Sequence, residues 1–227
     1  MTRRLLFSLI MIFGLLLGGC NLASGIAPHT PTPRAAWLTK FLEYPVCQPP
    51  CWENITPDQT TMAEAKAILA ANPAIKITHE RPKDIGWEFI PNEGQGSFHS
   101  LDNTPTVVDI IGLSLSPGQT LTLGEVINSY PNPTHIRFAQ NSHNLRKCFV
   151  AIYFEPLELE LSALNLPCKE TKQGSTSIVK LVVSPEAEVY YFSLGISPGS
   201  FSAHAEPGAI LEWSGYGEYV GYNVGYK

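Results

Sequence analysis

The chain carries Ile55-Thr-Pro-Asp-Gln-Thr-Thr-Met-Ala-Glu-Ala-Lys-Ala-Ile-Leu-Ala-Ala-Asn-Pro73 and, sixty positions later, Leu115-Ser-Pro-Gly-Gln-Thr-Leu-Thr-Leu-Gly-Glu-Val-Ile-Asn-Ser-Tyr-Pro-Asn-Pro133. Both stretches contain Thr-x-x-Glu, at Thr61 and Glu64 and again at Thr122 and Glu125. This pattern is typical of a capping box, in which the Thr hydroxyl and the Glu carboxylate each accept from the other residue's backbone amide. Apolar residues then recur at helical spacing: Met62, Ala65, Ile68 and Leu69 in the first stretch, and Leu123, Val126, Ile127 and Tyr130 in the second. Each stretch therefore predicts a turn that leads into a short, capped, amphipathic helix, which Asn-Pro ends.

Segments that read as β-strands follow each predicted helix. They are 75–78, 85–90, 97–101 and 106–115 after the first, and 135–139, 147–155, 157–163, 177–183 and 189–194 after the second. A helix followed twice by an antiparallel meander predicts an α+β fold of two tandem helix-plus-antiparallel-sheet repeats, each with a helix layer on a sheet layer. We expect the first repeat at 37–115 and the second, with an aromatic C-terminal extension, at 116–227.

The turn and capped helix resemble the unit of BamE/SmpA/OmlA-type lipoproteins and of the tandem β-lactamase inhibitor proteins. The stretch Pro50-Cys-Trp-Glu-Asn-Ile-Thr-Pro-Asp-Gln-Thr-Thr61 is also similar to a motif of uncharacterised bacterial lipoproteins. The resemblance covers roughly residues 50 to 200 and implies a duplicated α+β scaffold. The chain departs from the pattern at Asp58, where the families usually have Gly, and at Tyr130-Pro131, where a small residue is expected. No inhibitor contact residue can be carried over by position.

The first 36 residues predict export, lipidation and a flexible tether. Residues 1–19 combine Arg3 and Arg4 with an apolar run that is shorter than an ordinary membrane-spanning helix. The run ends at Leu17-Gly-Gly-Cys20, which resembles the lipobox of bacterial lipoproteins. That resemblance implies cleavage before Cys20 and lipidation of its thiol, and hence an extracytoplasmic protein anchored in the cell membrane or the outer membrane. The alternative is an uncleaved anchor or a plain secretory signal. Residues 20–36, with three prolines, read as the lipidated Cys and a tether.

Four cysteines remain after Cys20, and an even number in an exported chain predicts two disulfides. Three pairings are possible. We favour Cys47–Cys51 and Cys148–Cys168, because each pair lies within one local unit. A metal site is the alternative, but Cys-x3-Cys followed by a long gap does not match the usual zinc spacings.

The C-terminal tail places aromatic residues between glycines, at Trp213, Tyr216, Tyr219 and Tyr222. Such residues can stack on sugar rings or form a protein-binding surface. The alternative is a closing strand whose aromatic side chains pack on the core.

Charge and motif content exclude several classes of function. A net charge of −5 leaves no basic footprint for nucleic acid. The chain has no H-E-x-x-H, P-loop or G-x-G-x-x-G pattern, so we predict no catalytic residue, no metal and no cofactor. In Leu157-Glu-Leu-Glu-Leu161, we interpret Glu158 and Glu160 as the solvated face of a strand and not as a catalytic carboxylate pair.

The leading hypothesis is a non-enzymatic, lipid-anchored, extracytoplasmic binding or assembly module whose partners are the membrane and an unidentified protein or envelope polymer. A second hypothesis is a proteinaceous inhibitor or ligand-sensing domain that uses the concave sheet. A third is a cell-envelope hydrolase, which requires a Ser/His or two-carboxylate cluster.

Overall fold

The structure, a computed structural model, describes residues 34–43, 46–101, 106–141, 144–173, 176–203 and 210–224. The predicted signal segment 1–19, the predicted lipidation site Cys20 and most of the predicted tether lie outside these ranges. Within them, no helix is both long enough and apolar enough to span a membrane.

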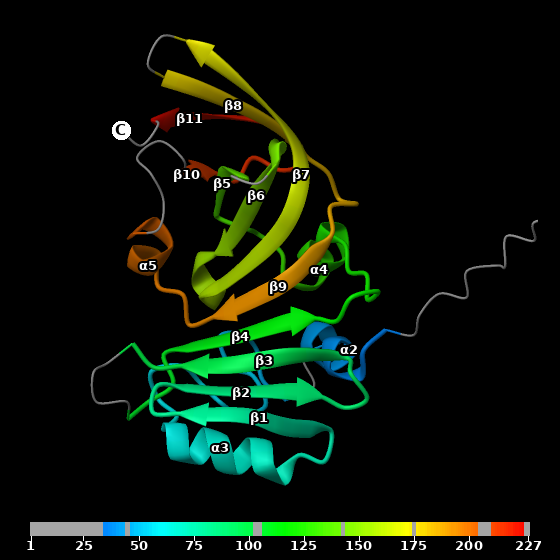
Figure 1. The fold of residues 1–227 in the computed structure, drawn as a ribbon, viewed down its shortest axis with the longest axis vertical. Coiled ribbons are helices and arrows are strands. Elements are labelled where there is room, and N and C mark those ends of the chain that lie inside the picture. Colours follow the sequence, from blue (N-terminus) through cyan, green and yellow to red (C-terminus); the bar gives the residue numbers. More distant parts are fainter. Residues whose placement is uncertain are drawn as a thin grey trace, which may run out of the picture. The chain divides into compact units, whose positions relative to one another are not determined.

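Strands dominate the described residues (Figure 1). They are β1 (Ile75–Arg81), β2 (Asp84–Phe89), β3 (Gly94–His99), β4 (Ile110–Leu115), β5 (His135–Asn141), β6 (Asn144–Phe154), β7 (Leu159–Gln173), β8 (Thr176–Val183), β9 (Val189–Leu194), β10 (Ile210–Glu212) and β11 (Gly217–Val224). All pairings among them are antiparallel, and together they form one eleven-stranded sheet within the described ranges. Its order is β1-β2-β3-β4-β9-β7-β6-β5-β10, and β8 joins β7 to β11.

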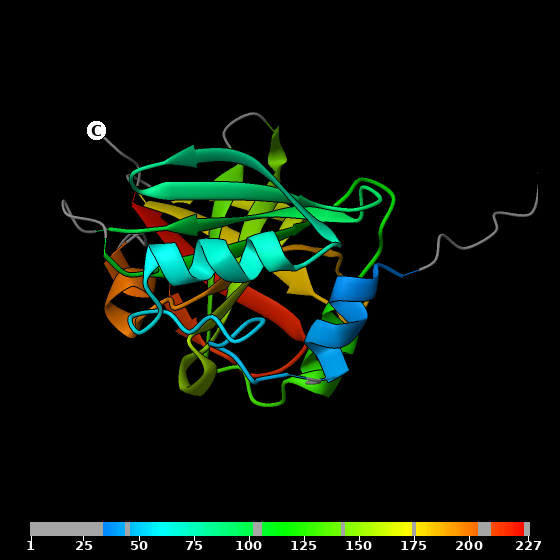
Figure 2. The same cartoon turned by 90° about the horizontal axis from the view of Figure 1, so that it is seen from below.

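The helices are short. They are α2 (Ala36–Glu43), α3 (Met62–Ala71), α4 (Leu123–Ser129) and α5 (Pro198–Ala203), and a 3₁₀ turn, η1 (Glu155–Leu157), precedes β7. Both predicted capping boxes are present, at Thr61/Glu64 on α3 and at Thr122/Glu125 on α4. Figure 2 shows α3 lying along the strands at the β1 end of the sheet, where it contacts β1.

The predicted fold class of two tandem helix-plus-sheet repeats is wrong. The predicted strands do form, but β9 lies between β4 and β7 and is hydrogen-bonded to both. This insertion joins the strands that follow α3 to those that follow α4, because the edges that two separate sheets would leave open are paired. The result is a predominantly antiparallel sheet with few helices, rather than two sheets that each carry a helix layer.

Strand β7 changes partners along its length. Its first part pairs with β6 on one side and β9 on the other, and its last part, from Cys168 onward, pairs with β8. In Figure 1 it is the long curved strand that connects these two parts of the sheet. The predicted strand 157–163 was therefore too short at its C-terminal end.

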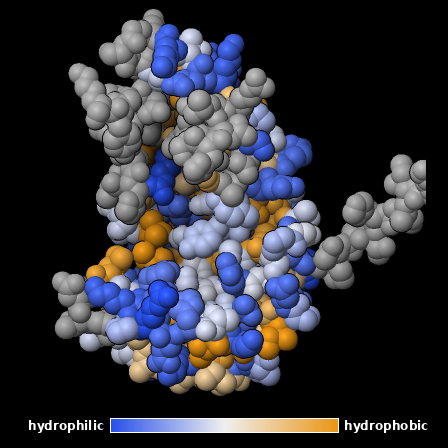
Figure 3. Space-filling view, in the orientation of Figure 1, coloured by the Kyte–Doolittle hydropathy of each residue, from blue (hydrophilic) through white to orange (hydrophobic). Residues whose placement is uncertain are grey.

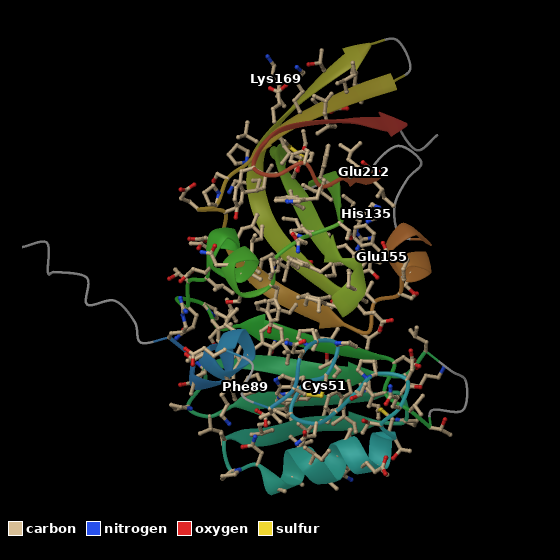
Figure 4. All side chains as sticks on the ribbon, turned by 180° about the vertical axis from the view of Figure 1, so that it is seen from behind. Cys51, Phe89, His135, Glu155, Lys169 and Glu212 are labelled. Atoms are coloured by element: carbon tan, nitrogen blue, oxygen red, sulfur yellow. A yellow bond between two sulfur atoms is a disulfide. The ribbon has the colours of Figure 1, made fainter. Side chains whose placement is uncertain are left out.

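Helix α2 was not predicted, and its first residue, Ala36, belongs to the segment assigned to the tether. Ala35 is fully buried, its amide donates to Gln119 Oε1 at 3.1 Å, and Arg34 forms an ion pair with Glu125. Trp37 of α2 stacks on Phe89 with 4.8 Å between ring centroids. In Figure 4, α2 and the segment around Cys51 lie in front of β1–β4, on the core side of these strands. Residues 34–36 are therefore part of the folded domain and not of a tether, because Arg34 and Ala35 make these contacts with it.

Two disulfides join Cys47 to Cys51 and Cys148 to Cys168, which is the pairing that the sequence analysis favoured. Their Cα atoms lie 5.6 and 5.7 Å apart, within the usual range for a disulfide. Cys148 is in β6 and Cys168 in β7, so this bond links two neighbouring strands. Both bonds are compatible with an extracytoplasmic protein.

Candidate functional site

The C-terminal aromatic residues divide between surface and core. Tyr219 on β11 is 5% exposed, its hydroxyl donates to Gly215 O at 2.7 Å, and the amide of Ser214 donates to it at 3.0 Å. Trp213 is half-buried against the core and stacks on Tyr219 with 5.9 Å between centroids. The alternative of a closing strand therefore describes Tyr219 correctly.

Tyr216 is the aromatic residue of this group that reaches solvent. It is 43% exposed and meets Trp213 edge to face, with 5.8 Å between centroids. Burial and the nearby negative charge of Glu186 raise the pKa of Tyr216, so its hydroxyl stays a neutral donor at neutral pH. Tyr222 lies in β11 opposite Ile178, and its side chain is outside the described part of the structure. Of the four predicted residues, Trp213 and Tyr216 form the part of this surface that a ligand could contact.

A second group of candidate residues lies on the face of the sheet away from α2, which we call the outer face. In Figure 3, hydrophilic and neutral colours predominate over this side of β1–β4. Neighbouring strands place five residues in one row across it, since cross-strand partners project to the same side. The row is His79, Gly86, Ser97, Gly112 and Ser193, from β1, β2, β3, β4 and β9.

Ser97 lies at one end of a Ser–His–Asp arrangement. Its Oγ is 2.9 Å from Nε2 of His99, two positions along the same strand. Nδ1 of His99 is 3.3 Å from Oδ1 of Asp84, the residue directly opposite His99 on β2. Oδ2 of the same carboxylate is 2.6 Å from Nε2 of His79. The sequence analysis predicted no such cluster, because Asp84, Ser97 and His99 match no local motif and only the register of β2 with β3 brings them together.

The Asp84–His99 contact is close but poorly directed. Oδ1 of Asp84 is buried and, among the described residues, makes no hydrogen bond, although it lies 3.3 Å from His99 Nδ1. We therefore treat it as a close contact and not as a formed hydrogen bond.

Glycines flank Ser97 on both neighbouring strands, and the side chains of His79 and Tyr191 lie over these glycines. A Cβ at Gly86 would lie 2.0 Å from the His79 ring, and a Cβ at Gly112 would lie 2.3 Å from the Tyr191 hydroxyl and 3.1 Å from Ser97 Oγ. The Tyr191 hydroxyl is thus beside the serine. Burial, opposed in part by a hydrogen bond to Ser193 and reinforced by the charge of Glu160, raises the pKa of Tyr191. Its hydroxyl therefore remains a donor.

A second serine matches a nucleophile-elbow motif in sequence. Gly195-Ile-Ser-Pro-Gly199 has the G-x-S-x-G pattern and connects β9 to α5. In the structure Ser197 Oγ accepts from the Ser200 amide at 3.2 Å and donates to Ser200 Oγ at 3.0 Å, so it caps the first turn of α5. Among the described side chains, no imidazole contacts it. The motif here marks a helix cap and not a nucleophile–base pair.

The interpretation of Glu158 and Glu160 as one solvated strand face is wrong. Glu158 precedes β7 in a left-handed conformation at φ 45°, whereas Glu160 is 7% exposed. Both oxygens of Glu160 accept from Arg137 Nη2 at 3.0 Å, and the Arg137 guanidinium lies 4.8 Å from the ring centroid of Phe201 on α5. Burial, with the negative charges of Glu158, Glu155 and Glu160, raises the pKa of the neighbouring Tyr153 to about 12. Glu160 is thus buried and paired with Arg137, which also donates to Phe201 O of α5 at 3.1 Å.

The edge beside this pair carries further polar side chains. His135 of β5 lies opposite Glu212 of β10, and Figure 4 shows both along the same side of the molecule as Glu155. Lys169, at the other end of β7 in that view, faces Lys180 across the strand pair. No group of three or more His, Cys, Asp or Glu side chains within the described ranges has the geometry to hold a metal ion.

Comparison with known proteins adds no assignment. No protein-family model matches the chain, and neither the curated proteins nor the solved structures contain a significant match.

Proposed function

We propose that the chain is a lipid-anchored, extracytoplasmic binding module. The observation that carries the proposal is the lipobox-like Leu17-Gly-Gly-Cys20 after a short apolar segment. The two disulfides agree with an oxidising compartment. Two or more acyl chains at Cys20 are enough for stable membrane attachment.

A Cys20→Ser variant tests the anchor. In a bacterial host that processes lipoproteins, we expect the full-length chain in the membrane fraction and the variant mostly in the soluble extracytoplasmic fraction, because it cannot be acylated. The readout is immunoblotting of the fractions after osmotic release. Cys47→Ser is the matched control, since it also replaces a cysteine by serine, here at the Cys47–Cys51 disulfide, but should leave the chain on the membrane. A Cys20→Ser chain that stays membrane-bound would show that the anchor assignment is wrong.

Binding is assigned to the Trp213–Tyr216 surface. Both rings present a face or edge with a polar tip, which suits a sugar ring of an envelope polymer or an aromatic-binding protein. The inhibitor or ligand-sensing alternative, which uses the concave sheet, stays a second proposal.

A Tyr216→Ala variant tests this surface. We expect its affinity for isolated cell-wall polysaccharide to fall about tenfold, which corresponds to roughly 1.4 kcal/mol. The measurement is the change in tryptophan fluorescence on titration, because Trp213 lies against Tyr216. Val182→Ala is the control, since Val182 is 58% exposed on β8 but is not aromatic. Equal affinity of Tyr216→Ala and the unaltered chain would remove this surface from the proposal.

A further inference from the structure

We propose that Ser97 is the nucleophile of an acyl-transfer site on the outer face of β2–β4, with His99 as its general base, Asp84 as a positioning residue and a carboxylic ester as substrate. This goes beyond the proposed function, which assigns only anchoring and binding. It also supplies the Ser/His cluster that the hydrolase hypothesis required.

The order of contacts is the one that acyl transfer needs. The serine oxygen meets Nε2 of His99 at 2.9 Å, and the carboxylate meets the other ring nitrogen, Nδ1, at 3.3 Å. With the carboxylate at Nδ1, the favoured neutral tautomer carries its proton on Nδ1. Nε2 is then the acceptor for the Ser97 hydroxyl proton.

Asp84 is held in place independently of His99. Its Oδ2 is bound by His79 at 2.6 Å, which leaves the buried Oδ1 facing His99. A buried carboxylate oxygen without a hydrogen bond is costly. Its 3.3 Å contact with Nδ1 places Asp84 where it can hold the imidazole of His99 in one orientation.

Tyr191 supplies a donor on the side of Ser97 away from His79. Gly112 has no side chain, and this lets the Tyr191 hydroxyl lie above it beside Ser97 Oγ. A neutral phenol placed next to a nucleophile can donate to the oxyanion that develops when a carbonyl is attacked. We assign this role to Tyr191.

The reaction balances without any other group. Ser97 Oγ forms a bond to the ester carbonyl carbon, its proton moves to His99 Nε2, and the carbonyl electron pair moves to the oxygen that Tyr191 faces. Collapse breaks the bond to the alcohol oxygen, which takes the proton from Nε2. Water then attacks the acyl-serine with proton transfer through His99, and this releases the acid and restores Ser97.

The exposure of the site favours esters over amides as substrates. His99 has a 44% exposed side chain, so water reaches the cluster and weakens each electrostatic contact. An alcohol is a better leaving group than an amine and needs less help from such a site.

Labelling with a biotinylated alkyl fluorophosphonate tests the proposal on the full-length chain in mild detergent. The probe reports a nucleophilic serine directly, because Ser97 Oγ displaces fluoride from phosphorus and passes its proton to His99. We expect peptide mass spectrometry to find the adduct on Ser97, at least tenfold less adduct in His99→Gln, and none in Ser97→Ala. Tyr191→Phe should label about tenfold more slowly.

Two serines serve as matched controls. Ser197→Ala removes the G-x-S-x-G serine, and Ser114→Ala removes a serine of the same sheet face, and neither should change labelling.

For Asp84→Asn, we expect a lower kcat for p-nitrophenyl acetate with an unchanged KM, which loss of fold would not produce. Exogenous imidazole should restore part of the activity of His99→Ala. Absence of adduct on Ser97 in the unaltered chain, adduct on Ser197 instead, or full labelling of His99→Gln would each overturn the proposal. None of these outcomes depends on Cys20, so they are separate from the test of the anchor.

Discussion

Arg137→Ala is expected to lower the free energy of unfolding by about 3–5 kcal/mol, which is the usual loss when one partner of a buried ion pair is removed. Glu160 is 7% exposed, and the Arg137 side chain is 20% exposed and donates to both carboxylate oxygens. Without the guanidinium, Glu160 must stay buried as an uncompensated anion or take up a proton. The variant also loses the contact of Arg137 with the Phe201 ring and with Phe201 O.

The measurement is urea unfolding followed by circular dichroism, with the disulfides intact. A double variant, Arg137→Met with Glu160→Leu, should recover most of the loss, because apolar residues of similar volume leave no buried charge. Lys180→Ala is the surface control. Its partner Glu218 is 3.3 Å away, both side chains are more than half exposed, and such pairs contribute about 0–1 kcal/mol. A loss below about 1 kcal/mol for Arg137→Ala would mean that water reaches this pair.

Glu160 illustrates what local patterns could not reveal. The alternation in Leu157-Glu-Leu-Glu-Leu161 predicted a strand with one polar side, and β7 does place Leu159 and Leu161 in the core. The opposite side was predicted to face solvent, because nothing in that segment indicates α5. In the structure, α5 packs over the outer face of β5 and β6 through Phe201. Which side of a strand faces water depends on elements elsewhere in the chain.

The same limit explains the error in fold class. Capping boxes and helical spacing are local signals, so α3 and α4 were predicted correctly at their N-termini. Most strands were predicted from alternation in the same way. The position of β9 between β4 and β7 is set by long-range pairing, which no short segment encodes. Two meanders that were expected to be separate therefore became one sheet.

The candidate sites divide along this line as well. The aromatic tail was visible in sequence, and what remained unknown was that Tyr219 would be buried while Tyr216 stayed exposed. The Asp84–His99–Ser97 cluster was not predicted, because Asp84 meets His99 only through the register of β2 with β3. The one serine that matches a catalytic motif, Ser197, caps a helix. The sequence motif indicates Ser197, whereas proximity to a histidine in the structure indicates Ser97.

Trp87→Ala is the second substitution with a large expected effect, about 3–5 kcal/mol of unfolding free energy. Trp87 on β2 is 1% exposed and stacks on Trp52 with 5.2 Å between centroids, and Phe98 lies at 4.5 Å. Its ring also covers Gly96 on β3, where a Cβ would be 2.2 Å from the indole. Truncation removes all of these contacts and leaves a cavity that the surrounding strands cannot close.

Burial of the Trp87 ring also carries an unfavourable free energy, since its Nε1 has no hydrogen-bond partner among the described residues. Trp87→Phe removes that unpaired donor while keeping much of the apolar contact, so we expect it to lose clearly less stability than Trp87→Ala. Trp213→Ala, which truncates a half-buried ring, should lose less stability than either Trp87 variant, as measured by urea unfolding followed by circular dichroism. Gly96→Ala should also destabilise, because its methyl group would collide with the indole, and in the Trp87→Ala background the same substitution should cost little. A Gly96→Ala penalty that is unchanged in that background would show that the two positions are not coupled, and that the indole does not rest on this glycine.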